Sequence, residues 1–240
     1  MQEETKEKVE AEIKDWTYLQ ELPDTCHGFK LSREKKIVES MYDIYSYIHP
    51  QLHKKAVIYY HEETREYKVR VYIGLIEFCR IEFITANLKD FERLLRLQFE
   101  KLLKDMETYN PTSLSSIVLK MGIEEWGDAC SLPETCEGFN LFISPKQPEK
   151  INNGSYVLIN YVDFSIESDF TIYYNIYRNE FFGEARIWDI PDVNYDFDSA
   201  TLDELAAKLQ IYMVPRLQEI RQRALKEAAA KEKKKNDYHR

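Results

Sequence analysis

Three histidines, His49, His53 and His61, lie close together in the chain. Neutral imidazole is a common ligand of zinc and other transition metals. His49 and His53 have the spacing that places two ligands on one face of a helix, and two glutamates follow His61. However, Pro50 lies between the first two histidines, and proline ends or kinks a helix. One hypothesis is therefore a metal-dependent enzyme that uses this region, and the simpler interpretation is surface histidines near a turn.

Cys26 is followed by His27, which raises the question of nucleophilic catalysis. A cysteine nucleophile needs a neighbouring base and a lowered pKa. The chain repeats the surrounding sequence at Cys136, where Glu137 takes the place of the histidine. The two copies therefore share no Cys–His pair, and a free cysteine is commonly a small buried apolar residue. We predict no catalytic role for this stretch.

The spacing of Asp192, Asn194, Asp196 and Asp198 imitates a calcium-binding loop. Phe197 stands where the sharp turn of such a loop requires glycine. Acidic residues just before a helix are also favourable through the helix dipole alone. We interpret the segment as an acidic loop that precedes the last helix.

The second half of the chain combines acidic residues with tyrosines. Residues 155–198 contain nine acids and two arginines. In the strand expected over residues 170–178, Tyr173 and Tyr177 alternate with apolar residues. Aromatic side chains often anchor protein interfaces, and acids attract a basic partner. The candidate partner-binding residues are Tyr173, Tyr177, Asp163 and Asp189.

A repeated stretch organises the elements that carry these residues. Residues 13–31 (IKDWTYLQELPDTCHGFKL) and residues 123–141 (IEEWGDACSLPETCEGFNL) match at a constant spacing of 110 positions, and nine of the nineteen positions are identical. Such agreement without gaps indicates a tandem duplication. We therefore predict two domains, residues 1–110 and 111–240. We interpret the repeated stretch as a core plug and tight turn that fastens each fold.

Each half is expected to be α+β: a helix, the repeated loop motif, a three-stranded antiparallel meander and a C-terminal amphipathic helix. The strands follow from period-two alternation, as at Tyr67, Val69, Val71 and Ile73. For residues 34–48, the apolar positions predict a helix, because they are spaced by three or four. In the second half, strands are expected near residues 156–166, 170–178 and 182–190. The last helix begins after a capping box formed by Thr201 and Glu204.

Composition restricts the class of function. The net charge of −9 and a pI near 5.2 argue against a nucleic-acid binder, which needs a concentrated basic face. The first residues lack the apolar core of a signal peptide, and no apolar run is long enough to span a membrane. The four cysteines lack metal-binding or secreted spacing, which favours a reducing cytoplasmic location. No phosphate-binding loop or hydrolase motif is present, so we expect no cofactor.

The sequence thus predicts a non-enzymatic, cytosolic binding or adaptor protein. Its second repeat would present an acidic, tyrosine-bearing sheet surface to a protein partner, and the acids favour a basic one. The alternatives are the metal-dependent enzyme that uses the histidine region and an acidic mimic of nucleic acid.

Overall fold

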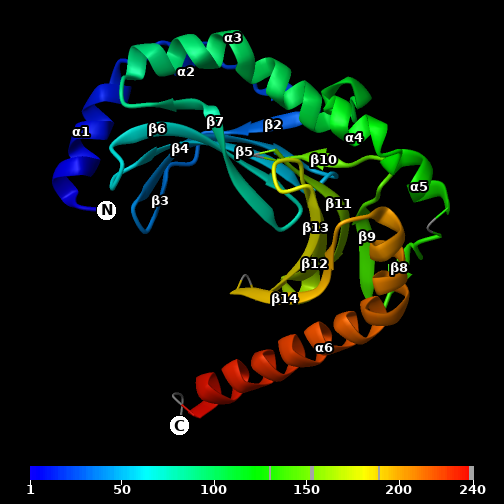
Figure 1. The fold of residues 1–240 in the computed structure, drawn as a ribbon. Helices are drawn as coiled ribbons and strands as arrows, with labels where there is room; N and C mark the ends of the chain where they lie inside the picture. Colours follow the sequence, from blue (N-terminus) through cyan, green and yellow to red (C-terminus); the bar gives the residue numbers. More distant parts are fainter. Residues whose placement is uncertain (130, 152–153, 189, 238–240) are drawn as a thin grey trace. The chain divides into compact units, whose positions relative to one another are not determined.

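A computed structural model describes residues 1–129, 131–151, 154–188 and 190–237. The chain divides into two compact units, Met1–Asn110 and Pro111–Arg240. Each unit contains a seven-stranded antiparallel sheet with helices before and after it (Figure 1). The protein is therefore α+β, as predicted, and the similar order of elements in the two units supports a tandem duplication.

The first unit begins with two helices, continues through its sheet and ends with a long helix. Its strands have the spatial order β1-β2-β4-β5-β6-β7, and β3 pairs with β4. The elements are α1 (Glu3–Lys14), α2 (Tyr18–Glu21), β1 (Thr25–Cys26), β2 (Phe29–Ser32), β3 (Lys36–Val38), β4 (Met41–His49), β5 (Lys54–His61), β6 (Glu66–Ile73), β7 (Ile76–Thr85) and α3 (Leu88–Glu107).

The second unit follows the same plan. Its strands have the order β14-β13-β12-β11-β9-β8, and β10 pairs with β11. The elements are η1 (Pro111–Ser113), α4 (Ser116–Lys120), α5 (Ile123–Ala129), β8 (Thr135–Cys136), β9 (Phe139–Ile143), β10 (Glu149–Lys150), β11 (Ser155–Asp163), η2 (Phe164–Ile166), β12 (Ser168–Asn175), β13 (Glu180–Ile187), β14 (Ile190–Ser199) and α6 (Leu202–Asp237).

Two predicted elements are wrong. The helix expected over residues 34–48 is β3 and β4, and the acidic loop expected before the last helix is β14. In β4 the pairing register shifts between Asp43 and Tyr45, which is the signature of a β-bulge. The bulge changes the phase of the apolar alternation, and six consecutive residues of β4 are buried. The expected three-stranded meanders correspond to β5–β7 and β11–β13, which are parts of larger sheets.

The two sheets agree in register at a spacing of 114 residues. Tyr42 pairs with Tyr60 in the first unit, and Tyr156 pairs with Tyr174 in the second. The β-bulge that follows Asp43 in β4 recurs after Val157 in β11. The spacing is 110 in the repeated stretch and 114 from β4 onward, because the second unit has four more residues between them.

The core of each unit lies between one face of the sheet and its helices. In the first unit α1 and α3 cover the same face (Figure 1), and α3 buries Phe91, Leu95, Phe99, Leu102, Leu103 and Met106. In the second unit Leu205, Leu209, Leu217 and Ile220 of α6 join the buried residues of the sheet. Burial of these apolar side chains is the main stabilising contribution.

The end of the repeated stretch, from Thr25 in the first unit and Thr135 in the second, forms a tight β-hairpin. The turn residues His27 and Gly28 both have positive φ, as do Glu137 and Gly138. Two positive φ values define a type I′ turn, which favours glycine in the second position. The hairpin is held to the sheet in the same way in both units, because the hydroxyl of Tyr47 donates to the carbonyl of Pro23 at 2.6 Å. The hydroxyl of Tyr161 donates to the carbonyl of Pro133 at 2.7 Å.

Candidate functional site

The three histidines of the metal hypothesis do not converge. His49 pairs with Lys54, and His61 pairs with Met41, so the two histidines lie at opposite ends of the β4–β5 ladder. Eight residues of strand separate these ends by about 26 Å. His53 lies in the turn between the strands with a positive φ. Within the described residues, no group of three or more histidine, cysteine or acidic side chains could hold a metal ion.

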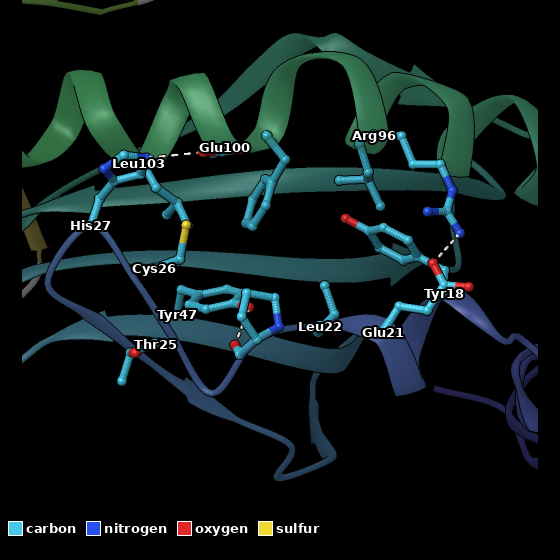
Figure 2. A pocket seen from close by; sticks show the side chains of 13 residues that line it. Tyr18, Glu21, Leu22, Thr25, Cys26, His27, Tyr47, Arg96, Glu100 and Leu103 are labelled. Carbon is cyan, nitrogen blue, oxygen red and sulfur yellow. Dashed lines mark hydrogen bonds and ion pairs between the residues drawn. The ribbon is translucent and has the colours of Figure 1, made fainter.

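Cys26 and His27 line a pocket of the first unit (Figure 2). Burial raises the pKa of the Cys26 thiol, and the carboxylates of Glu100 and Glu107 raise it further. His27 lies against the same two acids, with Nε2 at 3.4 Å from Glu100 Oε1 and Nδ1 at 4.0 Å from Glu107 Oε2. A thiol with a raised pKa is a poor nucleophile at neutral pH. The environment of Cys26 therefore does not favour cysteine catalysis.

The four candidate partner-binding residues of the second unit have different environments. Tyr177, in the turn after β12, is 79% exposed, whereas Tyr173 is 6% exposed and stacks on Phe182 at 5.1 Å between ring centroids. Asp163 is buried at the end of β11. Asp189 lies outside the described residues. Of these residues, Tyr177 is the one that offers an aromatic ring to a partner.

Asp163 has contacts that are structural. Arg221 of α6 donates to Asp163 Oδ2 at 2.8 Å, and the Ser165 backbone N–H and hydroxyl donate to Oδ1. Burial acts to raise the pKa of Asp163, but these hydrogen bonds outweigh it and the pKa is lowered. The ionised carboxylate therefore fastens α6 to the end of β11.

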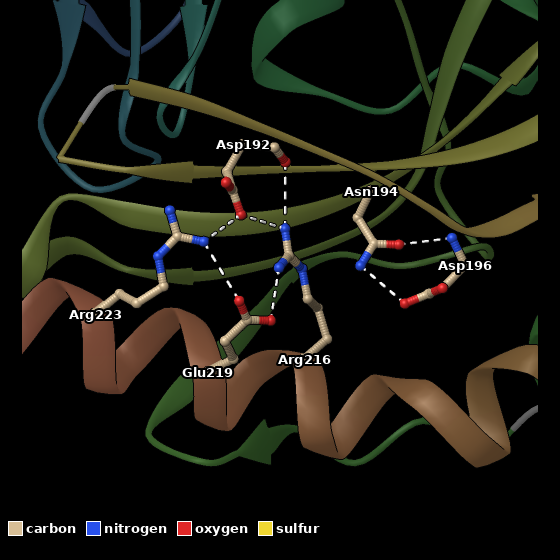
Figure 3. A network of polar contacts seen from close by, with 6 residues as sticks. All are labelled: Asp192, Asn194, Asp196, Arg216, Glu219 and Arg223. Atoms are coloured by element: carbon tan, nitrogen blue, oxygen red, sulfur yellow. Dashed lines mark hydrogen bonds and ion pairs between the residues drawn. The ribbon is translucent and has the colours of Figure 1, made fainter.

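Asp192 belongs to a second structural network, which connects β14 to α6 (Figure 3). Arg216 and Arg223 both bind Asp192 Oδ2, and both arginines also pair with Glu219. An extended strand cannot wrap around an ion as a calcium loop does. The calcium interpretation is therefore wrong for this segment.

β14 also carries exposed side chains that do not bind Arg216 or Arg223. Val193 is 63% exposed and Tyr195 is 76% exposed, and the acids Asp196 and Asp198 follow and are exposed as well. We call these four residues the edge strip, because β14 is the last strand in the order of its sheet. Val193 and Tyr195 alternate with Asp192 and Asn194, and this alternation indicates a strand. The acidic composition of the segment led to the prediction of a loop instead.

Negative charge dominates around the edge strip. Burial raises the pKa of Asp198, and the neighbouring Glu180 raises it further, against the effect of Lys208. Lys208 is shared, since it also pairs with Glu204 at 2.9 Å. The carboxylate of Asp196 accepts a hydrogen bond from the uncharged amide of Asn194 at 2.9 Å. The edge strip therefore combines the exposed side chains of Val193 and Tyr195 with two acids whose charge basic side chains neutralise only in part.

Comparison with known proteins yields no matching family model, no matching curated protein and no matching solved structure. Among the helices of the described residues, none has both the length and the apolar character required to cross a membrane.

Proposed function

We propose that the protein is a non-enzymatic binding protein whose second unit binds a basic, extended segment of a protein partner along the edge strip. The single observation that supports this proposal most is the exposure of Val193 and Tyr195 on a terminal strand, beside Asp196 and Asp198. Tyr177 is also exposed, in the turn between β12 and β13, with its ring beside Gly154. We also propose that the protein acts in the cytoplasm, where the cysteines would stay reduced.

The occupant is an extended peptide because the last strand of a sheet is a template for pairing with another chain. Its preferred charge is positive because the strip carries two exposed acids, Asp196 and Asp198. Alternating side chains of the bound strand would place apolar residues against Val193 and Tyr195 and lysines or arginines toward the acids. Tyrosine is among the residues that most often dominate binding energy in such interfaces.

The proposed binding is tested with a short fluorescein-labelled peptide in which lysine alternates with valine, followed by fluorescence anisotropy. We expect saturable binding that weakens as salt is added, because exposed charges are screened by ions. Tyr195→Ser should lower the affinity about tenfold or more, as expected for an aromatic anchor. The double change of Asp196 and Asp198 to asparagine should lower it about two- to tenfold.

The duplication supplies a matched control. Ile81 of β7 occupies the position 114 residues before Tyr195 and is also exposed, at 61%. Ile81→Ser should leave the affinity for the basic peptide unchanged, and a peptide with glutamate in place of lysine should not bind. Equal losses in the Ile81 and Tyr195 variants, or no saturable binding of the basic peptide, would refute the proposal.

The alternative of a nucleic-acid mimic requires a contiguous stripe of unpaired acids. Asp163 and Asp192 are instead paired with arginines, and Asp169 is buried. These three acids cannot contribute to such a stripe. The edge strip is too short to imitate a nucleic-acid backbone by itself.

A further inference from the structure

The first unit contains a pocket of about 550 Å³ between its hairpin, α2 and α3 (Figure 2). Small-molecule sites usually have volumes of roughly 300–1,000 Å³ and apolar or aromatic walls with a few polar groups. The apolar part of this pocket is formed by Tyr18, Leu22, Tyr47, Leu95, Phe99 and Leu103. All of these residues belong to one unit, so the pocket is complete within residues 1–110.

One end of the pocket is electronegative. His27 and Glu100 meet there, and Glu107 lies at 4.0 Å from His27 Nδ1. Burial raises the pKa of the Cys26 thiol, and the same two carboxylates raise it further. The Glu100 side chain is 81% exposed, so its carboxylate can turn toward a ligand without leaving a buried partner.

The other end of the pocket holds a cation that is already neutralised. Arg96 pairs with Glu21 and Glu92, each at 2.8 Å, and its guanidinium lies 4.9 Å from the centroid of the Tyr18 ring. Two carboxylates therefore balance one guanidinium. An anionic ligand would find no uncompensated positive charge at Arg96.

Comparison with the second unit shows which residues of this pocket recur in the duplicate and which are particular to the first unit. At the positions spaced by 110 or 114 residues, most uncharged residues of the wall are retained, as Leu132, Pro133, Cys136, Tyr161, Leu209 and Leu217, whereas Asp128 replaces Tyr18 and Met213 replaces Phe99. The charged residues are replaced: Glu21 by Ser131, His27 by Glu137, Arg96 by Gln210 and Glu100 by Val214. The retained residues serve the fold of both units, whereas the charged groups are particular to the first.

We propose that this pocket binds a small organic cation, an amine carried on an aromatic or aliphatic body. The body would lie in the pocket against the wall that Tyr47 and Phe99 form by packing on each other, at 5.7 Å between ring centroids, and the ammonium group would lie toward Glu100. The carboxylate supplies charge-assisted hydrogen bonds to the ammonium group. This site lies in the first unit and is independent of the edge strip.

The test compares three ligands of nearly equal shape: phenethylamine, the neutral phenethyl alcohol and the anionic hydrocinnamate. Binding to the full chain is followed by chemical-shift changes in ¹⁵N-labelled protein. We expect saturable shifts for phenethylamine at amides of the hairpin and α3, with the alcohol about tenfold weaker and the acid weaker still. No saturable binding of phenethylamine, or equal affinity for all three ligands, would overturn the proposal.

Variants locate the site and separate charge from folding. Glu100→Gln should weaken phenethylamine binding about fivefold and leave the alcohol unchanged, because the carboxylate contributes only to the cation. The matched control is Glu137→Gln, an exposed acid in the corresponding hairpin of the second unit. Equal effects of the two variants would also reject the site, and the dispersion of the amide spectrum shows whether each variant is folded.

Discussion

Substitution of the hairpin glycines tests how each unit holds its repeated stretch. Gly28 has a φ of +76°, and an added Cβ would lie 2.6 Å from His49 Nε2. The His49 ring cannot move away easily, because it is buried against Phe29 and its Nδ1 accepts backbone hydrogen bonds from the two residues Gln51 and Leu52. Gly28→Ala should therefore combine backbone strain with overpacking.

Gly138 has the same backbone geometry but a different neighbour. Its φ is +86°, and an added Cβ would meet the guanidinium of Arg221. Arg221 is a long side chain that is 37% exposed, so it can swing aside at the expense of its ion pair with Asp163. Gly138→Ala should therefore lower the free energy of unfolding through backbone strain and through the weakening of one ion pair.

The two costs can be compared from these contacts. A left-handed backbone costs about 1–2 kcal/mol for a residue with a Cβ. Overpacking adds about 1–3 kcal/mol where the neighbour is fixed, which gives roughly 2–5 kcal/mol for Gly28→Ala. A partly exposed ion pair adds only about 0–1 kcal/mol, which gives roughly 1–3 kcal/mol for Gly138→Ala.

Native-state hydrogen exchange measures the two losses separately, because it reports the opening free energy of each segment. Amides of β2 and β4 should lose protection in Gly28→Ala, and amides of β9 and β11 should lose less in Gly138→Ala. Equal losses in the two variants, or a larger loss for Gly138→Ala, would show that the fixed His49 ring is not the source of the difference.

Four further substitutions test three contacts of the second unit. Because the pKa of Asp163 is lowered below its ordinary 3.8, its ion pair with Arg221 stabilises the fold above that pH and is lost as the pH falls further. In Asp163→Asn, the free energy of unfolding measured by urea denaturation should fall less steeply as the pH is lowered. An unchanged pH dependence at acid pH would contradict this role of Asp163. Asp192→Ala leaves the buried Arg216 with one acid fewer and should lower the free energy of unfolding by about 3 kcal/mol. Arg216→Met should lower it less, because no buried charge is left unpaired. The reverse order in denaturant titrations would contradict this expectation. Tyr161→Phe removes one hydrogen bond to the hairpin and should cost about 1 kcal/mol by the same measurement, so no loss would mean that this bond is not needed.

Much of the fold follows from patterns in the sequence, and the errors have physical causes. The alternation in β6 is regular because one face is buried against helices, so residues 67–73 are predicted as a strand. β4 is buried on both faces and contains a bulge, so its apolar residues lose the period of two. Asn87 and Thr201 accept backbone hydrogen bonds at the starts of α3 and α6, and both caps are evident from residue type.

The candidate sites were harder to predict, because burial depends on the whole sheet. Tyr173 and Tyr177 share an alternation pattern, but one lies within the sheet and the other in a turn. Asp163 and Asp192 contribute to the acidic composition, but arginines of α6 that are distant in sequence neutralise them. The pocket of the first unit joins residues near position 25 to residues near position 100, a proximity that no local pattern contains.

Mapping of the bound peptide tests the proposed function most directly. Backbone amide shifts of the ¹⁵N-labelled protein should be recorded during titration with the lysine–valine peptide. The proposal predicts saturable shifts confined to β14, the neighbouring β13 and the turn at Tyr177, with no change in the corresponding strand β7. Shifts centred on β7, or spread without a pattern over both units, would contradict the assignment of the binding surface to the edge strip.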